Sequence, residues 1–320
     1  MPRDPPVTSA RLPSSSRAST GNEDGENGET LELLTTRSSN AACGPIGQVL
    51  VFPSWADHAR STRPRSSFPV DARELEGKRA LVTGGSRGIG AAIVRRLTDA
   101  GARVIASART PVADFPADAT FVPGDVGTLA GAQAIARRAE ELLGGVDILI
   151  NNAGAARAFA GALAVSDEEW VDALNANYLA AVRLSAALLP GMIARQRGVI
   201  VNISSVAAYI AGPPLIHYGA AKAALNAYSK SLATELAPRG IRVNVVSPGN
   251  VTSPGADRIR EDIAGHLGID SQAMAAGIPL GRKGTPTDIS ELIGFLVSER
   301  AAWITGSTFL IDGGEGPFVV

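Results

Sequence analysis

The fold is decided by the stretch Arg79-Ala-Leu-Val-Thr-Gly-Gly-Ser-Arg-Gly-Ile-Gly90. An apolar run typical of a short strand comes first, glycines follow at positions 84, 88 and 90, and Ala91–Leu97 has a helical pattern. This order places backbone amides around a phosphate at a helix N-terminus. We expect Gly84 to make the tight turn, Gly88 to admit a pyrophosphate and Gly90 to let the helix approach the strand.

Strand-like and helix-like segments alternate along the rest of the chain. Further strands are expected at Arg103–Ser107, Thr120–Val122, Asp147–Ile150, Val199–Ile203, Ile241–Val246 and Thr308–Ile311. Helices are expected at Thr128–Leu143, at Glu168–Ala194 with a break at Pro190, and at His217–Leu236. Continuous apolar strands are typical of parallel sheets buried on both faces. The pattern therefore predicts the α/β class, with a Rossmann-type doubly wound parallel sheet.

The first 74 residues differ from the rest in composition. They hold 11 serines and 8 of the 20 prolines, with an acidic patch from Glu23 to Glu32 and no sustained periodicity. We expect residues 1–74 to be a disordered tail and residues 75–320 to be one catalytic domain. An organelle transit peptide and a mispredicted start codon stay open as origins of this tail.

Composition favours a soluble enzyme. Hydrophobic residues make up 45% of the chain and its formal net charge is −1, so neither nucleic acid nor an acidic membrane surface is indicated as a partner. The single cysteine, Cys43, rules out an intrachain disulfide. We find no apolar run near the roughly 18 residues of a membrane span and no convincing metal cluster. We expect a cytoplasmic protein.

Tyr218 and Lys222 stand at positions i and i+4, and Ser205 lies thirteen residues upstream of the tyrosine. On a helix the two side chains share a face. A lysine cation about 4 Å from a phenolate stabilises it by roughly 4 kcal/mol at an effective dielectric of about 20. This equals roughly three pKa units, which brings a phenol of ordinary pKa about 10 toward neutrality. Such pairs also arise by chance on amphipathic helices, so the rest of the chain must decide.

Six short motifs together resemble the classical short-chain dehydrogenase/reductase family. They are Thr83-Gly84-x-x-x-Gly88-Ile89-Gly90, Asn151-Asn152-Ala153-Gly154, Asn177, Ser205, Tyr218-x-x-x-Lys222 and Pro248-Gly249. The likeness runs from about Leu75 to about Gly314, and is greatest to 3-oxoacyl-carrier-protein reductases and related secondary-metabolite ketoreductases. It implies a seven-stranded sheet, an oxidoreductase acting on a carbonyl or secondary alcohol, and a homotetramer or dimer.

The resemblance also implies four catalytic residues, Asn177, Ser205, Tyr218 and Lys222. Hydride from NADPH would reach the carbonyl carbon while Tyr218 donates a proton to the oxygen. Ser205 would orient the carbonyl, and Lys222 would lower the tyrosine pKa and hold the nicotinamide ribose. Asn177 would support a water relay to the lysine. Ser204 and Asn175 compete for the serine and asparagine roles, but the family register favours Ser205 and Asn177.

The cofactor is predicted to be NADP(H). Arg109 lies 19 residues after Gly90, where NAD-binding folds place a carboxylate, and Arg87 adds a second cation in the glycine turn. The resemblance places the adenine near Asp125 and Val126 and the carboxamide near Val251 and Thr252. The full set of expected cofactor residues is Gly84, Ser86, Arg87, Gly88, Ile89, Gly90, Arg109, Asp125, Val126, Asn152, Ala153, Gly154, Tyr218, Lys222, Pro248, Gly249, Val251 and Thr252. Asn151 is either structural or cofactor-binding.

The substrate stays open at this point. Ser253–Leu280 is expected to contain an amphipathic helix over the cleft, and the segment Ile210–Leu215 is expected to wall the other side. A 3-oxoacyl thioester, a steroid-like ketone, a sugar or a small cyclic ketone all fit. Two competing functions are an alcohol dehydrogenase working in oxidation and a catalytically silent nucleotide sensor on the same fold. The presence of both Tyr218 and Lys222 favours catalysis over the sensor.

Overall fold

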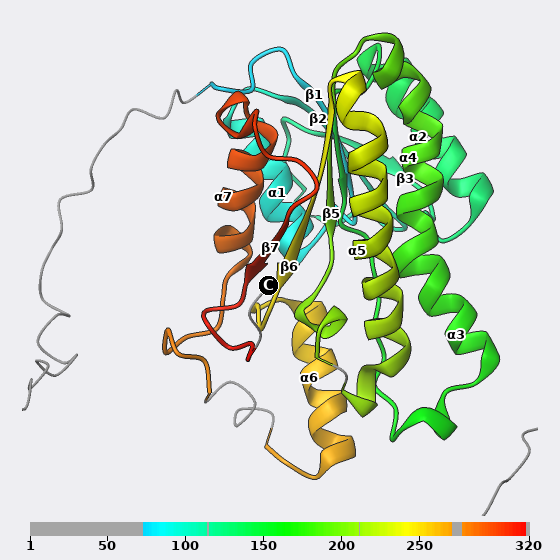
Figure 1. Ribbon diagram of the computed structural model, residues 1–320, viewed down its shortest axis with the longest axis vertical. Coiled ribbons are helices and arrows are strands. Elements are labelled where there is room, and N and C mark those ends of the chain that lie inside the picture. Colours follow the sequence, from blue (N-terminus) through cyan, green and yellow to red (C-terminus); the bar gives the residue numbers. More distant parts are fainter. Residues whose placement is uncertain (1–72, 114, 211, 271–276, 318–320) are drawn as a thin grey trace, which may run out of the picture. The chain divides into compact units, whose positions relative to one another are not determined.

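The computed structural model describes residues 73–113, 115–210, 212–270 and 277–317. Its centre is one seven-stranded sheet in the order β3-β2-β1-β4-β5-β6-β7, and every neighbouring pair is parallel (Figure 1). The strands are β1 (Arg79–Thr83), β2 (Arg103–Ala108), β3 (Thr120–Pro123), β4 (Ile148–Asn151), β5 (Gly198–Ile203), β6 (Ile241–Pro248) and β7 (Thr308–Ile311). The predicted doubly wound parallel sheet is confirmed.

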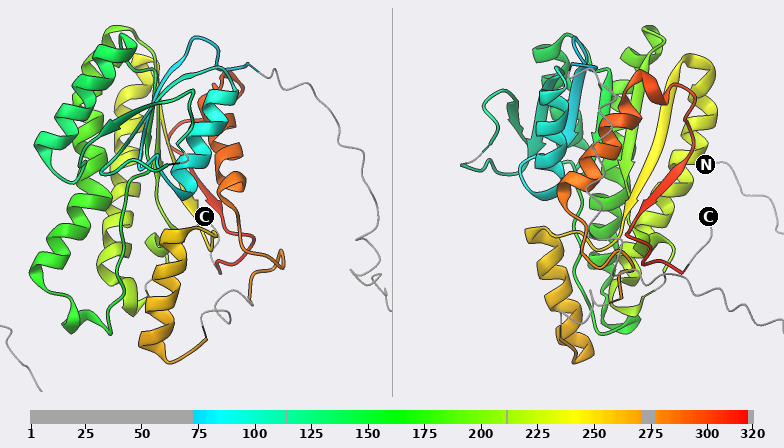
Figure 2. Two further views of the ribbon diagram at one scale, coloured as in Figure 1. Left: turned by 180° about the vertical axis from the view of Figure 1, so that it is seen from behind. Right: turned by 90° about the vertical axis from the view of Figure 1, so that its left-hand side faces the viewer.

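Helices cover both faces of the sheet. One face carries α1 (Gly88–Asp99) and α7 (Pro286–Val297), and the other carries α2 (Leu129–Leu143), α4 (Ala180–Ala194) and α5 (Ile216–Leu236) (Figures 1 and 2). Strand residues alternate between the two layers. Val82 packs with the α1 and α7 side, whereas Leu81 packs with the α2 and α4 side, and both are fully buried. The two apolar cores explain why the strands have no polar alternation.

The order of the strands reverses between β1 and β4. In open parallel sheets this switch point leaves a crevice at the carboxyl ends of the strands, where ligands bind. Helix α6 (Pro254–Leu267) lies beyond this same edge (Figures 1 and 2). The fold thus places the ends of β1, β4 and β5 around one candidate site.

One prediction about the helices is wrong, and one helix was not predicted. The helical stretch after Ser166 does not break at Pro190, which lies inside α4. Instead α3 (Asp167–Leu174) passes through a π-helical segment, Asn175–Leu179, before α4 begins. A proline removes only one backbone donor, and α4 continues past it to its end. Helix α7 was not predicted at all, although Thr285 and Asp288 form a capping box with a proline at the first helical position.

One helical stretch in the described residues, Asp167–Ala194, is long and apolar enough to be tested as a membrane span, with a mean hydropathy of 1.3 over its most apolar window. About 39% of that window is buried within the protein. Its second half packs against α2 and β5, and Leu184 and Leu188 are completely or almost completely buried. The stretch is therefore a core helix of the fold.

Candidate active site

The glycine turn has the geometry of a phosphate cradle. Gly84 and Gly88 have φ angles of 63° and 53°, in the left-handed region that favours glycine. A Cβ on Gly90 would stand 2.1 Å from the carbonyl oxygen of Gly84, so only glycine lets α1 approach the turn this closely. The N-cap residue Arg87 makes no side-chain cap. The first amides of α1 are therefore left for an anion.

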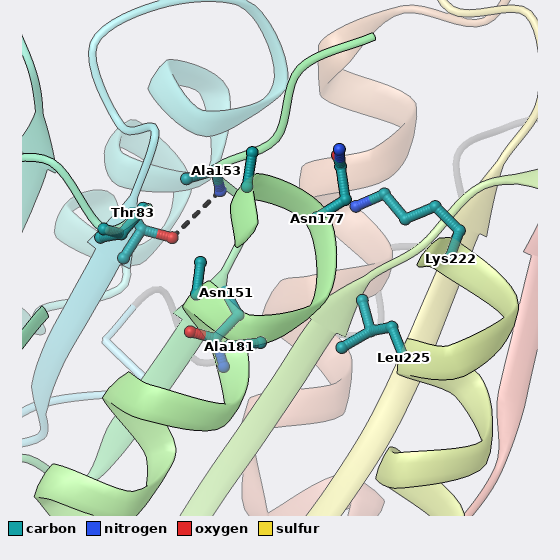
Figure 3. Close-up of a pocket in the computed structure, with 10 residues that line it drawn as sticks. Thr83, Asn151, Ala153, Asn177, Ala181, Lys222 and Leu225 are labelled. Atoms are coloured by element: carbon teal, nitrogen blue, oxygen red, sulfur yellow. Dashed lines mark hydrogen bonds between the residues drawn. The ribbon is translucent and has the colours of Figure 1, made fainter. Parts of the chain in front are cut away.

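Thr83 and Asn152 hold the glycine turn against the end of β4. Thr83 Oγ1 accepts hydrogen bonds from the amides of Asn152 (3.1 Å) and Ala153 (3.0 Å; Figure 3). The Asn152 carboxamide donates to the carbonyl oxygens of Thr83 (2.9 Å) and Gly84 (3.2 Å). Asn152 was predicted to bind the cofactor, but its side-chain NH2 group is used in these hydrogen bonds to the glycine turn. Thr83 was not assigned a role, although it begins the glycine motif.

Two cations lie close to the glycine turn in sequence and fold, Arg87 within the turn and Arg109 directly after β2. Arg87 and Arg109 are exposed, and neither guanidinium makes a hydrogen bond or ion pair within the described residues. Asp125 uses its Oδ1 locally, accepting from the amide of Gly127 (2.9 Å). Its neighbour Val126 lines a small cavity beside the switch point. The guanidinium groups are therefore free to meet an anionic ligand.

Tyr218 and Lys222 come from the start of α5 and lie one turn apart. Lys222 is only 3% exposed, and its Nζ lies 5.7 Å from the centroid of the Tyr218 ring. The amine donates to the carbonyl oxygen of Ile203 (2.8 Å) at the end of β5. Burial penalises the ammonium and lowers the pKa of Lys222 to about 8.

The expected lowering of the Tyr218 pKa is not seen in this ligand-free structure. Burial raises the pKa of Tyr218, and the hydrogen bond with the Ser205 hydroxyl offsets part of that rise. The physical reason is that removing water from a phenolate costs free energy. The Lys222 amine, which could stabilise the phenolate, is bonded to the carbonyl oxygen of Ile203 instead. Ser204 is turned away, donating to the backbone oxygen of Lys222 (3.4 Å), so Ser205 is the serine beside the tyrosine.

Asn177 lies in the π-helical segment, a feature often found at functional sites. It is 2% exposed, and its Nδ2 donates to the carbonyl oxygens of Ala155 (2.7 Å) and Ala173 (3.0 Å). Its Oδ1 accepts from the Ala155 amide (3.2 Å). The competitor, Asn175, accepts instead from Arg183 (2.8 Å). Asn177 is thus the asparagine that faces the site.

Gly154 closes the space between Asn177 and Lys222. A Cβ at this position would stand 2.7 Å from Asn177 Oδ1 and 3.4 Å from Lys222 Nζ. The Lys222 amine reaches toward Asn177 in Figure 3. Beside them is a cavity of about 10 Å³, lined also by Thr83 and Asn151. Its size suits a single water molecule with several polar partners.

A side chain from α6 holds the loop that follows β6. Arg260 is 5% exposed and donates to the carbonyl oxygen of Val251 (3.2 Å), and the Thr252 amide donates to Gly284 (2.8 Å). Val251 was expected to contact a carboxamide, but the residue is only 3% exposed and belongs to the core, and its carbonyl oxygen is bonded to Arg260. Arg260 was not predicted as a site residue, because its role depends on the folding of α6 over the loop.

The substrate side is formed by the segment after Gly154, by α5 and by α6. His266 Nε2 contacts the carbonyl oxygen of Ala158 (3.1 Å), which joins α6 to that segment. His217 is buried against Phe159 and Trp170, with ring centroids 5.1 Å and 6.2 Å away, and burial lowers its pKa. Its position agrees with a structural role. Ile210 is 41% exposed at the rim, and His58 lies outside the described residues.

A larger cavity, of about 500 Å³, opens at the opposite edge of the sheet. Its cations already have partners. Lys78 pairs with Glu299 (2.9 Å), Arg197 pairs with Asp147 (3.3 Å), and Arg242 donates to three backbone carbonyl oxygens. The glycine turn, the exposed arginines and the titratable pair all lie at the carboxyl edge instead. The described residues contain no group of three or more metal-ligating side chains.

Comparison with known proteins finds relatives over most of the chain. A family model described as enoyl-(acyl carrier protein) reductase matches residues 84–315. The chain is 37% identical over 246 residues to a 3-oxoacyl-acyl-carrier-protein reductase from Vibrio cholerae, covering 75% of this chain and 98% of the relative. It is 38% identical over 247 residues to the Escherichia coli reductase of the same name, and 36% identical over 247 residues to nodulation protein G of Rhizobium meliloti, each with the same coverage.

Solved structures give the same likeness. A structure described as a short chain dehydrogenase/reductase family protein superposes with a TM-score of 0.67 at 37% identity, covering 75% of this chain and 98% of that one. The crystal structure of gox2181 superposes with a TM-score of 0.68 at 31% identity, covering 76% and 97%. About three quarters of this chain is thus similar to these proteins, over nearly their whole length.

Proposed function

The chain belongs to the classical short-chain dehydrogenase/reductase family of oxidoreductases, and on that premise we propose that it reduces a ketone with NADPH. The observation that carries the proposal is the convergence of Asn177, Ser205, Tyr218 and Lys222 at the switch point, beside the glycine cradle. These side chains come from three separate segments, because Tyr218 and Lys222 share α5. Proton donation to a carbonyl oxygen is the chemistry that they can perform together.

Bound NADPH would supply the hydride. Tyr218 would give its proton to the carbonyl oxygen, because a phenol with a raised pKa is fully protonated at neutral pH. Ser205, already bonded to the tyrosine, would donate to the same oxygen and orient it. Lys222 and Asn177, with a water molecule in the cavity between them, would return a proton to Tyr218 after each turnover. The raised pKa also favours reduction over alcohol oxidation, which needs the phenolate.

We infer that NADP(H) is preferred over NAD(H). Arg87 and Arg109 are exposed and unpaired within the described residues, and a guanidinium can grip a phosphate through two donors. The glycine turn and the amides at the start of α1 would hold the pyrophosphate. Asp125 would contact the adenosine, and Thr252 in the loop after β6 would contact the carboxamide.

The proposed substrate is a small carbonyl compound, with 3-oxoacyl thioesters the first class to test because two of the relatives are named for them. We further propose a cytoplasmic homo-oligomer, a tetramer or a dimer, assembled through α4, α5 and β7. The experiment is to follow NADPH absorbance with a panel of 3-oxoacyl thioesters, quinones and cyclic ketones. The Tyr218→Phe variant should lose almost all turnover and still bind NADPH. Full activity in that variant would overturn the proposed role of the tyrosine.

A further inference from the structure

The end of β5 contacts α5 through consecutive residues. Asn202 Nδ2 donates to Ser229 Oγ (2.8 Å), and the carbonyl oxygen of Ile203 accepts from Lys222 Nζ (2.8 Å). The next two residues bond to the Lys222 backbone and to the Tyr218 hydroxyl, as described above. Tyr218, Lys222 and Ser229 are spaced i, i+4 and i+11, so all three lie on one face of the helix. The end of β5 thus contacts one face of α5 at several positions along the helix.

The contact between Asn202 and Ser229 belongs to a chain of buried hydrogen bonds, in which each residue donates to the next. Asn151 Nδ2 donates to Asn202 Oδ1 (2.8 Å), Asn202 Nδ2 donates to Ser229 Oγ (2.8 Å), and Ser229 Oγ donates to the carbonyl oxygen of Leu225 (2.6 Å). The side chains of Asn151, Asn202 and Ser229 are between 0% and 6% exposed. Both ends of the Asn202 carboxamide are used, and a satisfied buried network of this kind is rigid.

We propose that Asn202 and Ser229 are positioning residues. Their hydrogen bond fixes the position of α5 along its own axis relative to β5, and this position determines where Tyr218 and Lys222 lie. The inference rests on the proposed function of that pair. Ser229 lies seven residues beyond Lys222, about two turns or roughly 10 Å along the helix. Apolar contacts between a helix and a sheet tolerate a small slide, but a directional hydrogen bond does not. A slide of about 1 Å would break the bond from Lys222 to Ile203, and errors of that size cost about 100-fold in rate.

Two matched variants on the same helix test the inference. Ser229→Ala removes the acceptor for Asn202 and leaves a buried donor unpaired. Ser231→Ala removes a hydroxyl that likewise bonds four residues back, to Ala227 (3.2 Å), but that is exposed. For Ser229→Ala we expect kcat to fall at least tenfold, the NADPH dissociation constant to rise several-fold, and Tm to drop. Ser231→Ala should leave the three quantities unchanged.

A double variant separates positioning from mere stability. Replacing both partners by apolar groups, as in Asn202→Leu with Ser229→Ala, removes the unpaired Asn202 donor. Asn151 Nδ2 then keeps only Ser185 Oγ as an acceptor (3.4 Å), so part of the lost Tm should return. Without the hydrogen bond the axial position of α5 relative to β5 is no longer fixed, so kcat should stay low. Recovery of kcat together with Tm would show that the network only stabilises the fold, and would overturn the inference.

A final readout needs no substrate, so it separates failure of this inference from failure of the proposed function. The chain has four lysines, and in ¹³C-lysine spectra the resonance lost in Lys222→Met identifies Lys222. In the ligand-free protein this resonance should titrate near the pKa of about 8. A displaced helix would admit water and move the titration of Lys222 upward in Ser229→Ala and in the double variant. An unchanged titration in both would overturn the inference even if no ketone were ever reduced.

Discussion

The amine of Lys222 donates a 2.8 Å hydrogen bond to the carbonyl oxygen of Ile203, deep beneath the candidate site. Burial lowers the pKa of this lysine from 10.5 to about 8. Between these two values the unfolded chain holds more protons than the folded protein, so stability rises with pH across this window. Below it, the buried ammonium costs about 3 kcal/mol, using about 1.4 kcal/mol per pKa unit.

Lys222→Met should therefore stabilise the ligand-free protein at pH 7 while abolishing its activity. We expect a gain of about 2 kcal/mol, because the lost hydrogen bond to Ile203 removes about 1 kcal/mol. The gain should shrink as the pH approaches 10.5. Urea unfolding at several pH values measures it. The control is Lys230→Met, an exposed lysine on the same helix, which should give no pH-dependent difference. A Lys222→Met protein that is less stable at pH 7 would contradict the burial cost.

The pH profiles of the two reaction directions should differ because of Tyr218. Its pKa is raised above the ordinary 10.0, so the phenol stays protonated through neutral and mildly alkaline pH. Ketone reduction needs the protonated form and should be nearly flat up to the pKa of Lys222 at about 8, whereas oxidation of the matching alcohol should increase steadily with pH. Both profiles are measured with NADPH absorbance. A reduction rate that falls through pH 7 would show that the tyrosine is ionised there.

Arg109→Asp should reverse the choice of cofactor. The guanidinium is exposed and has no partner within the described residues, so its loss should leave stability almost unchanged. We expect kcat/KM with NADPH to fall about 100-fold, since a charge-assisted pair contributes about 1.5 to 3 kcal/mol and the new carboxylate repels a phosphate. Efficiency with NADH should hold or rise. Arg95→Asp, also exposed but on α1, is the matched control. Equal losses with both nucleotides would argue against the phosphate contact.

The parts that could be predicted from sequence are those in which local chemistry decides the structure. Gly84, Gly88 and Gly90 have conformations or contacts that only glycine permits, and such positions are readable from spacing. The break of the long helix is different. Pro190 is a local signal, but the π-helical segment around Asn177 depends on the hydrogen bonds that its carboxamide makes with Ala155 and Ala173. Tertiary contacts therefore override the local preference there.

The properties that could not be predicted depend on burial. The spacing of Tyr218 and Lys222 indicates that they share a helix face, but the direction of a pKa shift follows from desolvation and from the partner that the amine selects. Val251 looks like any loop residue in sequence and proves to be core, because Arg260 and Gly284 hold its backbone. Such features require the packed structure.

Asp147→Asn should destabilise the protein without changing its catalysis. Asp147 is 2% exposed, and burial opposes its ionisation, but two hydrogen bonds from Arg79 (2.8 and 2.7 Å) outweigh this and lower its pKa to about 2. Because the folded pKa lies below the ordinary 3.8, the stabilisation is present at neutral pH and is lost as the pH falls toward 2. The variant keeps the shape of the side chain but leaves three arginines without their carboxylate.

We expect Asp147→Asn to lose about 3 kcal/mol at pH 7, the cost of breaking a buried ion pair, and this loss should diminish below pH 4. Urea unfolding at a series of pH values measures it, with the exposed Asp99→Asn as the matched control. Asp147 precedes β4, at the edge of the sheet opposite Asn151 and the candidate site. The kcat of the folded fraction should therefore match the wild type. A pH-independent loss would mean that shape, rather than charge, supports this end of the sheet, and a lower kcat would show that the two edges are coupled through β4.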